Sequence, residues 1–555
     1  MTVASRHRLP VAHTGWTMAT VLRVLRDHGL EAELEGSEDA VVSGLTTDSR
    51  EVEPGDLFMA WIGTALDAHD FVGSAAASGA TGLLVEIRAR PRLAQPAGEA
   101  HTGEAAAGDA PTPLPPRIFV EDGRRAAAIL AMAARPTPAR PLHVTAVTGT
   151  NGKTTTALLL RQLLASRGPS AALGTLGVVG ADGRVADGTA GLTTPGPVEL
   201  ARRVADLEAG GVRHLVLEAS SHALHQGRLA GLPVDTAVFT NLGRDHLDYH
   251  SSPVAYRDAK LRLLELLRPG GTVVVNRDDP GWASLRPPRG IRELSVGVAE
   301  SRYEGSSSGN SGGSPMDSSR GGSTRDADPA SLRALGVILG AAGSRFLLTR
   351  GEDSHPVTLP LPGRFNVENA LAAAGAALAA GLELPEVARE LASVSPPPGR
   401  MEVIARHPVP VFRDYAHTPD ALERVLEALR PLHRGRLLVV FGAGGDRDRT
   451  KRPLMGQVVA RGADVALVTS DNPRTEDPEQ ILDHILAGIP SSSQVEVHRI
   501  ADRRQAIRRA LELAVPGDAI LLAGKGHETV QEAGGETRPF DERQIVSELL
   551  GEVAT

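Results

Sequence analysis

The sequence contains no cysteine among its 555 residues. Disulfide bonds, thiolate nucleophiles and cysteine-ligated metal sites are therefore excluded, and a reducing compartment is permitted. Aromatic residues make up only 3% of the chain, and positive charge is in the minority, since the net charge is -8. A nucleic-acid-binding function is not expected, because it needs a basic surface that displaces counterions from phosphates. An anionic ligand must instead be held at a local site.

Long apolar runs are also missing. The most apolar stretch, "NALAAAGAALAAGLEL" from Asn369, is short and weakly apolar, so it predicts a packed helix and not a membrane span. The N-terminal segment "WTMATVLRVLRDHGL" is amphipathic and lacks the apolar core and cleavage site of a signal peptide. We therefore expect a cytoplasmic protein without membrane insertion.

The length predicts about three domains at roughly 150 residues each, because one hydrophobic core cannot serve so long a chain. Apolar β-branched runs alternate with helical patterns, which is typical of α/β proteins with parallel sheets. Strand candidates are "HVTAVTGT", "VRHLVLEAS", "DTAVFTNL" and "GTVVVNRDD" in the middle, and "RLLVVFGAGGDRD", "ADVALVTSDNPR" and "DAILLAGKGHE" in the last third. We place domains at residues 1–140, 141–395 and 396–555. Residues 93–116 and 305–330 are poor in large apolar side chains and predict disordered insertions.

The stretch "VTAVTGTNGKTTTALLLRQLL" has the pattern of a phosphate-binding loop. An apolar strand runs into residues 149–155, and an amphipathic helix follows. This order aims backbone N–H groups and a helix N-terminus at phosphates, with Lys153 on the β and γ oxygens and Thr154 on Mg²⁺. The spacing departs from the general P-loop pattern, because Val147 stands where a glycine is expected.

Polar residues follow other predicted strands. Glu218 ends the strand in "HLVLEASSH", where a carboxylate could hold the Mg²⁺ that the loop needs. The segment "TNLGRDHLDYH" crowds Asp245, His246 and His250 into one loop, and such a cluster is also compatible with a zinc site. The segment "DNPR" at residues 471–474 places opposite charges around a proline, and taken alone it is typical of a solvated turn.

Seven motifs occur together and in one order: "TGTNGKTTT", "LEASSH", "TNLGRDHLDYH", "DYAHTPDALE", "GAGGDRDRTKRPLMG", "DNPRTEDP" and "GKGHE". With them the chain resembles the Mur ligase family, and most closely the branch that adds meso-diaminopimelate. The likeness extends from "TTDSR" at Thr46 to "GKGHE" at Gly524, apart from the two predicted insertions. The loop with Val147 is the form that this family uses.

The resemblance implies an N-terminal UDP-binding α/β domain, a central P-loop-type ATPase domain with a parallel sheet, and a Rossmann-like C-terminal domain. It also implies an ATP-dependent ligase of peptidoglycan precursor synthesis. Such an enzyme joins meso-diaminopimelate to UDP-N-acetylmuramoyl-L-alanyl-D-glutamate through an acyl phosphate, with Mg²⁺ as cofactor. We expect a monomer. The alternatives are a lysine-adding ligase or a folylpolyglutamate synthetase of the same family, or a P-loop regulatory NTPase that acts as a switch or binding protein.

The resemblance assigns residues to each role by position. The ATP-binding residues are Gly149, Thr150, Asn151, Gly152, Lys153, Thr154, Thr155, Asp414 and His417. The catalytic residues are Lys153, Glu218, His246 and Lys260, of which Glu218, His246 and Lys260 (as a carbamate) join Thr154 as metal ligands. The residues expected to bind the UDP-linked dipeptide, which we call the donor substrate, are Thr47, Ser49, Thr193, Thr194, Ser220, Gln226 and Arg228. The diaminopimelate residues are Arg447, Asp471, Asn472, Pro473, Arg474, Gly524 and Glu528. Arg474 is the form associated with diaminopimelate, since a guanidinium can grip its second carboxylate with two hydrogen bonds.

Overall fold

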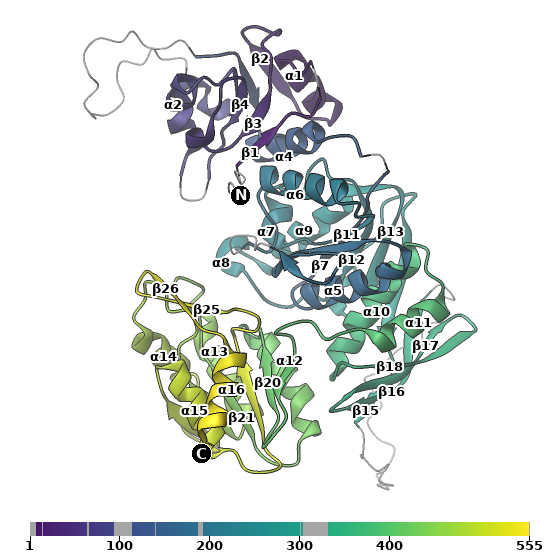
Figure 1. Ribbon diagram of the computed structural model, residues 1–555, viewed down its shortest axis with the longest axis vertical. Coiled ribbons are helices and arrows are strands. Elements are labelled where there is room, and N and C mark those ends of the chain that lie inside the picture. Colours follow the sequence, from purple (N-terminus) through teal and green to yellow (C-terminus); the bar gives the residue numbers. More distant parts are fainter. Residues whose placement is uncertain are drawn as a thin grey trace.

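The computed structural model describes residues 7–13, 15–63, 66–93, 114–138, 140–186, 192–299, 301–303 and 331–553. The insertion predicted at 305–330 lies outside the described residues, as do residues 94–113 of the one predicted at 93–116. Three large sheets with flanking helices follow one another along the chain, and Figure 1 shows the central body lying between the two others. The predicted α/β class with three domains is confirmed. The boundaries near residues 140 and 396 stay predictions.

Six strands form the N-terminal sheet: β1 (Arg8–Pro10), β2 (Ala32–Glu35), β3 (Gly44–Thr46), β4 (Asp56–Met59), β5 (Gly82–Glu86) and β6 (Arg117–Val120). Their order is β1-β3-β4-β5-β6-β2, in which β3 to β6 are parallel and the edge strands antiparallel. The helices are α1 (Met18–Asp27), α2 (Val72–Ala77), α3 (Arg90–Leu93) and α4 (Gly123–Ala134). The loops after the parallel strands therefore meet at one edge of the sheet.

The central sheet contains β7 (His143–Thr148), β8 (Ser170–Gly174), β9 (Gly177–Val179), β10 (Val185–Ala186), β11 (His214–Glu218), β12 (Val234–Phe239), β13 (Leu267–Asn276), β14 (Arg292–Val298), β15 (Ser301–Tyr303), β16 (Leu332–Gly340), β17 (Gly343–Arg350) and β18 (Asp353–Leu359). Its order is β10-β9-β8-β11-β7-β12-β13-β14-β16-β17-β18, and β15 pairs with β16. The strands from β8 to β16 in this order are parallel. All four strands predicted in the middle of the chain are present.

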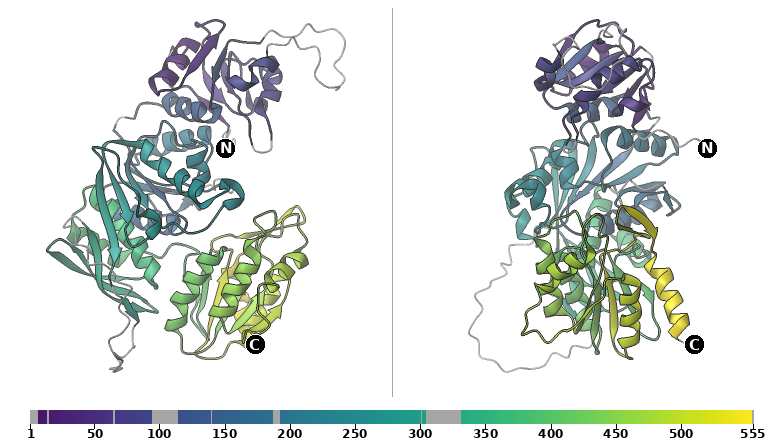
Figure 2. Two further views of the ribbon diagram at one scale, coloured as in Figure 1. Left: turned by 180° about the vertical axis from the view of Figure 1, so that it is seen from behind. Right: turned by 90° about the vertical axis from the view of Figure 1, so that its left-hand side faces the viewer.

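Helices cover both faces of this sheet. They are α5 (Lys153–Leu164), α6 (Pro197–Ala209), α7 (Ser221–His225), α8 (Leu247–His250), α9 (Pro253–Leu261), α10 (Arg364–Ala379) and α11 (Leu384–Ser393). The apolar side chains of α5, α10 and α11 form one buried cluster. Those of α6 and α7 belong to another, which also contains residues of α1 and α4. The N-terminal and central bodies thus share a continuous core, and Figure 2 shows α4 lying between them. The alanine-rich α10 is the packed helix that the sequence predicts.

The C-terminal sheet contains β19 (Glu402–Ala405), β20 (Val411–Asp414), β21 (Leu437–Phe441), β22 (Val465–Val468), β23 (Glu496–Arg499) and β24 (Ala519–Ala523). Its order is β19-β20-β24-β21-β22-β23, with only β19 antiparallel. The flanking helices are α12 (Pro419–Leu429), α13 (Lys451–Gly462), α14 (Pro478–Leu486), α15 (Arg503–Leu513) and α16 (Glu542–Val553), and a hairpin joins β25 (Val530–Ala533) to β26 (Glu536–Pro539). The three strands predicted in the last third are confirmed. Among the described residues, no helix is both long and apolar enough to cross a membrane.

Candidate active site

The phosphate loop has the predicted strand–loop–helix form. It leaves β7 at Gly149 and enters α5 at Lys153. Gly149 and Gly152 both have positive φ, and a Cβ at Gly149 would lie 1.9 Å from Thr240 Oγ1. A Cβ at Gly152 would lie 2.2 Å from Asn369 Oδ1. Because a side chain at either position would clash, the backbone can approach its neighbours this closely only with glycine.

The charged end of Lys153 folds back over this loop. Its Nζ donates to the carbonyl oxygens of Gly149, at 3.0 Å, and of Thr150, at 2.9 Å. Burial lowers the pKa of Lys153, although Glu218 and Asp245 partly offset this by favouring the cation. The side chain is therefore held within the loop, where a phosphate-binding lysine is needed.

Thr154 and Glu218 meet at the start of α5, as predicted. The Thr154 hydroxyl donates to Glu218 Oε2 at 2.9 Å, and the backbone N–H of Thr175 donates to Glu218 Oε1 at 2.9 Å. Glu218 is only 2% exposed. The contact arises because β11 is parallel to β7, so that Glu218 ends its strand opposite Val147. A hydroxyl beside a carboxylate is an oxygen donor pair that suits Mg²⁺.

Lys260 is buried, whereas a lysine on an amphipathic helix is ordinarily solvated. It is 1% exposed, its Nζ donates to Gly149 O at 2.8 Å, and it lies 4.4 Å from the centre of the Tyr256 ring. Burial, followed by the charge of Lys153, lowers the pKa of Lys260 well below its usual value. The structure thus brings this lysine to the phosphate loop, 111 residues away along the chain.

His246 has a left-handed backbone conformation at the start of α8, with φ of 52°. Its ring Nε2 lies 3.4 Å from Asp245 Oδ2, and its ring centre is 4.6 Å from that of His222. No group of three or more His, Cys, Asp or Glu side chains in the described part of the chain is arranged to hold a metal ion.

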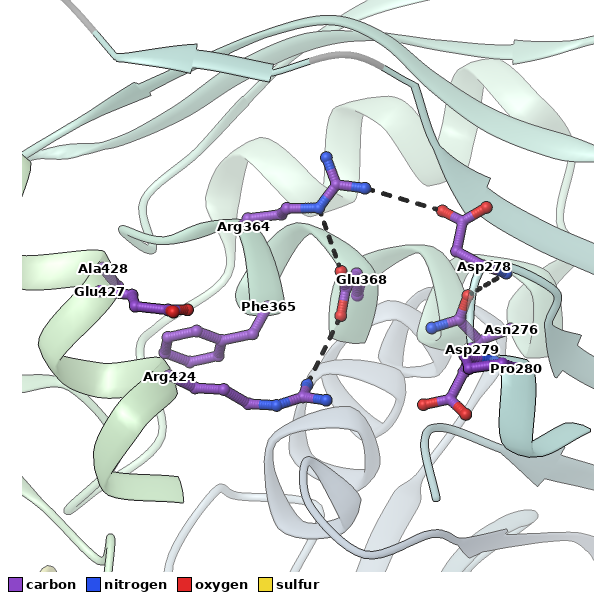
Figure 3. Close-up of a pocket in the computed structure, with 10 residues that line it drawn as sticks. All are labelled: Asn276, Asp278, Asp279, Pro280, Arg364, Phe365, Glu368, Arg424, Glu427 and Ala428. Atoms are coloured by element: carbon purple, nitrogen blue, oxygen red, sulfur yellow. Dashed lines mark hydrogen bonds and ion pairs between the residues drawn. The ribbon is translucent and has the colours of Figure 1, made fainter. Parts of the chain in front are cut away.

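A cavity of about 320 Å³ separates the central and C-terminal bodies. The predicted residues that line it are Thr150, Asn151, Gly152, Lys153, Thr154, Thr155, Thr193, Glu218, His246, Asp414, His417 and Arg447. A neighbouring pocket of about 440 Å³ shares Phe365 and Arg424 with it, and Figure 3 shows Glu368 at its centre. The cavity is therefore lined by residues of both bodies, including all the predicted ATP residues except Gly149 and all the predicted metal residues except Lys260.

Arg400 was not predicted, although it lines this cavity. Its Nη2 donates to Thr154 Oγ1 at 3.1 Å, and its guanidinium lies 4.6 Å from the Tyr415 ring centre. Asp414 orders this segment, because its carboxylate accepts from the N–H groups of Met401 and Ala416 at 2.7 and 2.8 Å. Arg400 ends the segment "SPPPGR", which begins at Ser395 beside the predicted domain boundary and resembles a linker in sequence.

Asp414 is buried and His417 is partly buried in the same wall, and burial shifts the pKa values of both. Burial raises the pKa of Asp414, with Arg400 acting in the opposite direction. Burial and the charge of Lys451 lower the pKa of His417 to about 4, and its Nδ1 lies 2.7 Å from Tyr415 O. His417 is therefore neutral near pH 7.

Most residues predicted to bind the donor substrate are connected to Glu218, directly or through one another, by hydrogen bonds. Thr194 Oγ1 donates to Glu218 O at 2.7 Å and lies 3.3 Å from the Ser220 hydroxyl. Arg228 donates to Thr194 O at 3.0 Å and to Gln226 Oε1 at 2.8 Å. Thr193 accepts from Thr175 Oγ1 at 3.3 Å. Thr47 and Ser49 instead follow β3 at the carboxyl edge of the N-terminal sheet.

The solvated-turn interpretation of "DNPR" is wrong, because Asp471 and Asn472 are 8% and 5% exposed. Asn472 Nδ2 donates to Glu528 Oε2 at 2.8 Å. Asn472 Oδ1 accepts from Lys525 Nζ at 3.0 Å. Lys525 lies in the motif "GKGHE" but was not among the predicted site residues. Gly524 has positive φ, and a Cβ there would lie 2.4 Å from Asp471 Oδ2.

Arg474 has φ of 55° and donates from Nη1 to Gly445 O at 2.8 Å. Its Nε is 3.0 Å from the Oε2 of Glu532, which also was not predicted. Arg447 lines the interdomain cavity and donates only to Asp446 O, at 3.2 Å, among the described residues. The predicted acceptor residues therefore extend from the cavity to the hairpin of β25 and β26.

Comparisons with known proteins give consistent matches. The model of the Mur ligase middle domain matches residues 147–377, and that of the Mur ligase glutamate ligase domain matches residues 399–526. The UDP-N-acetylmuramoyl-L-alanyl-D-glutamate–2,6-diaminopimelate ligase of Bradyrhizobium diazoefficiens is 39% identical, over 94% of this chain and 98% of its own. The enzyme of the same name from Gloeobacter violaceus is 41% identical, over 92% and 94%.

Solved structures match along nearly the whole chain. A structure of a UDP-N-acetylmuramoyl-L-alanyl-D-glutamate–2,6-diaminopimelate ligase has 32% identity and a TM-score of 0.59, covering 94% of this chain and 98% of its own. The MurF ligase of Thermotoga maritima, solved with ADP, has 18% identity and a TM-score of 0.54, covering 92% and 97%. The second likeness concerns the fold alone.

Proposed function

Because this chain belongs to the Mur ligase family, we propose that it joins meso-diaminopimelate to UDP-N-acetylmuramoyl-L-alanyl-D-glutamate at the expense of ATP. The reaction is an amide ligation in peptidoglycan precursor synthesis. The observation that carries the proposal is the interdomain cavity, in which the phosphate loop and Glu218 face Asp414, His417 and Arg447 of the C-terminal body. Three substrates can be positioned around such a space, and positioning is the main requirement of phosphoryl and acyl transfer without a protein nucleophile.

The side chains near Thr154 and Glu218 are suitable ligands for Mg²⁺. The Thr154 hydroxyl and the buried Glu218 carboxylate are 2.9 Å apart, and His246 lines the same cavity. We propose these three as its ligands together with a carbamate on Lys260. Mg²⁺ bound there would neutralise charge on the β and γ phosphates.

The residues of the loop then have defined tasks. The N–H groups of residues 152–155, at the start of α5, and the Lys153 ammonium bind the ATP phosphates. The N–H groups of Thr150 and Asn151 donate to Asn241 and hold the loop in shape. Thr194 and Ser220, which are tied to Glu218, hold the dipeptide end of the donor beside the γ phosphate. The γ-phosphoryl group passes to the donor carboxylate and ADP leaves. The acceptor amine attacks the resulting acyl phosphate, and an amide forms as phosphate and a proton are lost.

The environment of Lys260 favours carbamylation. Only a neutral amine attacks CO₂, and burial together with Lys153 lowers the pKa of Lys260 well below its usual value. The new N–C bond forms as the amine loses a proton, and it turns a potential cation into a carboxylate. We propose that this carboxylate lies beside the metal, where an ammonium would be repelled.

The acceptor pocket supplies opposite charges for a zwitterionic head group. Arg474 would bind the distal carboxylate of meso-diaminopimelate, and Glu528, held by Asn472, would bind its ammonium. L-lysine lacks the distal carboxylate, so Arg474 favours the diaminopimelate reaction over the lysine reaction. We also propose that the protein acts as a monomer and that the reaction, which uses ATP and a UDP-linked donor, takes place in the cytoplasm.

Phosphate release from ATP tests the proposal directly. With UDP-N-acetylmuramoyl-L-alanyl-D-glutamate present, release should require an amino-acid acceptor, and meso-diaminopimelate should support it far better than L-lysine. A regulatory NTPase would instead hydrolyse ATP without an acceptor. Equal rates with both amino acids would contradict the acceptor assignment but leave the ligase assignment in place.

A further inference from the structure

A salt bridge in the proposed acceptor pocket joins two segments that are distant in the sequence. Arg474 Nε lies 3.0 Å from Oε2 of Glu532, which is part of β25. In the part of the chain that the structure describes, neither side chain has another charged partner. The proposed function gives Arg474 a second anion, the distal carboxylate of the amino acid. Two carboxylates, one from the protein and one from the substrate, are thus available to one guanidinium.

The backbone of both segments is fixed without this salt bridge. Arg474 N donates to Glu532 O at 2.9 Å, and Gly534 N donates to Arg474 O at 2.7 Å. The N–H of Glu532 donates to Asn472 Oδ1 at 3.1 Å. Figure 1 shows the hairpin of β25 and β26 at the end of the C-terminal body that faces the central body. A change in the Glu532 side chain should therefore leave the pairing of hairpin and loop intact.

The Arg474 side chain is also held at its other end, where Nη1 donates to Gly445 O at 2.8 Å. A Cβ at Gly444 would lie 3.0 Å from Arg474 Nη1 and 3.7 Å from Arg447 Cγ. Arg474 therefore lies next to an arginine that lines the interdomain cavity. Since a guanidinium has five N–H donors, several remain for a substrate carboxylate. The backbone and Gly445 position Arg474, so Glu532 is not needed to hold it in place.

The two acids of this pocket are held differently. Glu528 Oε2 accepts from Asn472 Nδ2 at 2.8 Å and from Lys525 Nζ at 3.2 Å. Among the described residues, the Glu532 carboxylate has Arg474 as its one partner, and its side chain is 46% exposed. An exposed salt bridge contributes little free energy, so it is easily exchanged for another. Glu528 is thus a fixed acid, and Glu532 is a displaceable one.

Resting on the proposed function, we propose that Glu532 is a specificity-determining residue that occupies Arg474 until the distal carboxylate of the amino acid displaces it. The exchange replaces one anion on the guanidinium by another, so Arg474 is paired before and after binding. Meso-diaminopimelate must displace Glu532, whereas L-lysine leaves the salt bridge in place. Glu532 therefore weakens the binding of meso-diaminopimelate and narrows its advantage over L-lysine.

The variant Glu532→Gln tests the proposal, and Glu536→Gln is its matched control. Glu536 lies on the other strand of the hairpin and pairs with Arg538, and both side chains are exposed. Meso-diaminopimelate and L-lysine are titrated by calorimetry into the full chain with the donor substrate and a non-hydrolysable ATP analogue bound. Glu532→Gln should bind meso-diaminopimelate about two- to fivefold more tightly, since an exposed salt bridge no longer competes. Its affinity for L-lysine should not rise, and Glu536→Gln should change neither affinity.

Glu532→Asp separates displacement from simple repulsion between two carboxylates. It keeps the charge, but its side chain is one methylene shorter on the same backbone and should not reach Arg474 Nε. It should therefore also bind meso-diaminopimelate more tightly than the wild type. Unchanged or weaker binding by Glu532→Gln, equal tightening for both amino acids, or tightening by Glu532→Gln without Glu532→Asp would overturn the proposal.

Steady-state kinetics separate this proposal from the ligase assignment. Glu532→Gln should lower KM for meso-diaminopimelate by the same factor and leave KM for ATP and for the donor substrate unchanged. A chain that binds meso-diaminopimelate, and more tightly as Glu532→Gln, but ligates no amino acid would contradict the proposed function alone. A chain that ligates meso-diaminopimelate with the same KM in wild type and variant would overturn the role of Glu532 alone. A chain that does not bind meso-diaminopimelate would overturn both.

Discussion

Lys260 shows at the residue scale how burial can change the chemistry of a side chain. It forms no ion pair among the described residues, and its Nζ donates to Gly149 O. Lys260→Ala removes both the amine and the carbamate that we propose for it, so turnover should fall severely. A short-chain carboxylate such as formate should restore part of it, since the missing anion can enter from solution. Near-normal turnover of the variant without added carboxylate would show that no carbamate is needed.

Arg474 decides between acceptors at the same scale. Its side chain is 25% exposed, so the loss of its bond to the distal carboxylate should cost about 1–3 kcal/mol. Arg474→Ala should therefore raise KM for meso-diaminopimelate about 5- to 150-fold and leave KM for ATP unchanged. Discrimination against L-lysine should fall in the variant. Arg474→Lys should restore little, because an ammonium lacks the planar fork. An equal effect on both amino acids would remove Arg474 from the acceptor site.

Lys525 is a positioning residue for the same pocket. It is fully buried, and its Nζ donates to Asn472 Oδ1 at 3.0 Å and to Glu528 Oε2 at 3.2 Å. Lys525→Met keeps the length of the side chain but frees both partners, so KM for the amino acid should rise about tenfold. KM values for ATP and donor should not change. A uniform loss of kcat with all KM values unaffected would indicate a general structural role instead.

At the scale of elements, α10 of the central body and α12 of the C-terminal body are joined by an ion pair in the pocket next to the interdomain cavity. Glu368 of α10 lies between Arg364 Nε, at 3.3 Å, and Arg424 Nη1 of α12, at 3.8 Å (Figure 3). Burial raises the pKa of Glu368, while Arg424 and Arg364 lower it. Glu368→Gln removes the charge and should let the C-terminal body move more freely.

Spin labels can measure this change cleanly, because the chain has no cysteine of its own. With cysteines introduced at the exposed Arg389 of α11 and Gln480 of α14, Glu368→Gln should broaden the distribution of label distances. Glu423→Gln is the control, since its pair with Arg461 is exposed and lies within the C-terminal body. Identical distributions in the wild type and both variants would show that the Glu368 contact does not restrain the two bodies.

Elements also show what could be predicted from the sequence. The predicted strand, loop and helix at residues 143–164 are confirmed. They could be predicted because an apolar strand, a glycine-rich loop and an amphipathic helix are each recognisable from neighbouring residues alone. The hairpin of β25 and β26 was missed. Gln531 Nε2 donates to Asp471 O across 60 residues, and Arg474 N donates to Glu532 O, so the "DNPR" loop pairs with the hairpin edge. The turn at Gly534-Gly535 is a local hairpin signal that was overlooked. The pairing of the hairpin with the "DNPR" loop joins distant segments and leaves no periodic signal in either one.

The same limit applies to side chains that meet across domains. Arg400 and Lys260 reach the phosphate loop from sequence positions that look like a linker and a solvated helix. Their roles depend on tertiary packing. The resemblance to the Mur ligase family, and no local pattern, assigned Lys260 to the active site. Its Nζ contacts Gly149 O of the loop, and its role as a carbamate stays a prediction.

At the scale of the whole molecule, the three bodies are not equally connected. One buried cluster contains Leu25 and Ile129 of the N-terminal body together with Leu200 and Phe239 of the central one. The C-terminal body has two clusters of its own, and Phe365 is the partly buried residue of α10 that packs on one of them. The described contacts across the other boundary are mostly polar, such as Arg244 N to Asp420 Oδ2 at 3.1 Å.

We therefore expect two calorimetric unfolding transitions and not three, because segments that share a core unfold as one cooperative unit. Ile129→Ala and Ile485→Ala both remove buried apolar side chains and should each cost about 2–5 kcal/mol. Ile129→Ala should lower the transition of the joined N-terminal and central bodies and leave the C-terminal transition in place. Ile485→Ala should do the reverse, since Ile485 belongs to a C-terminal cluster. If Ile129→Ala instead separated a third transition, or if both variants shifted a single one, the shared core would not govern cooperativity.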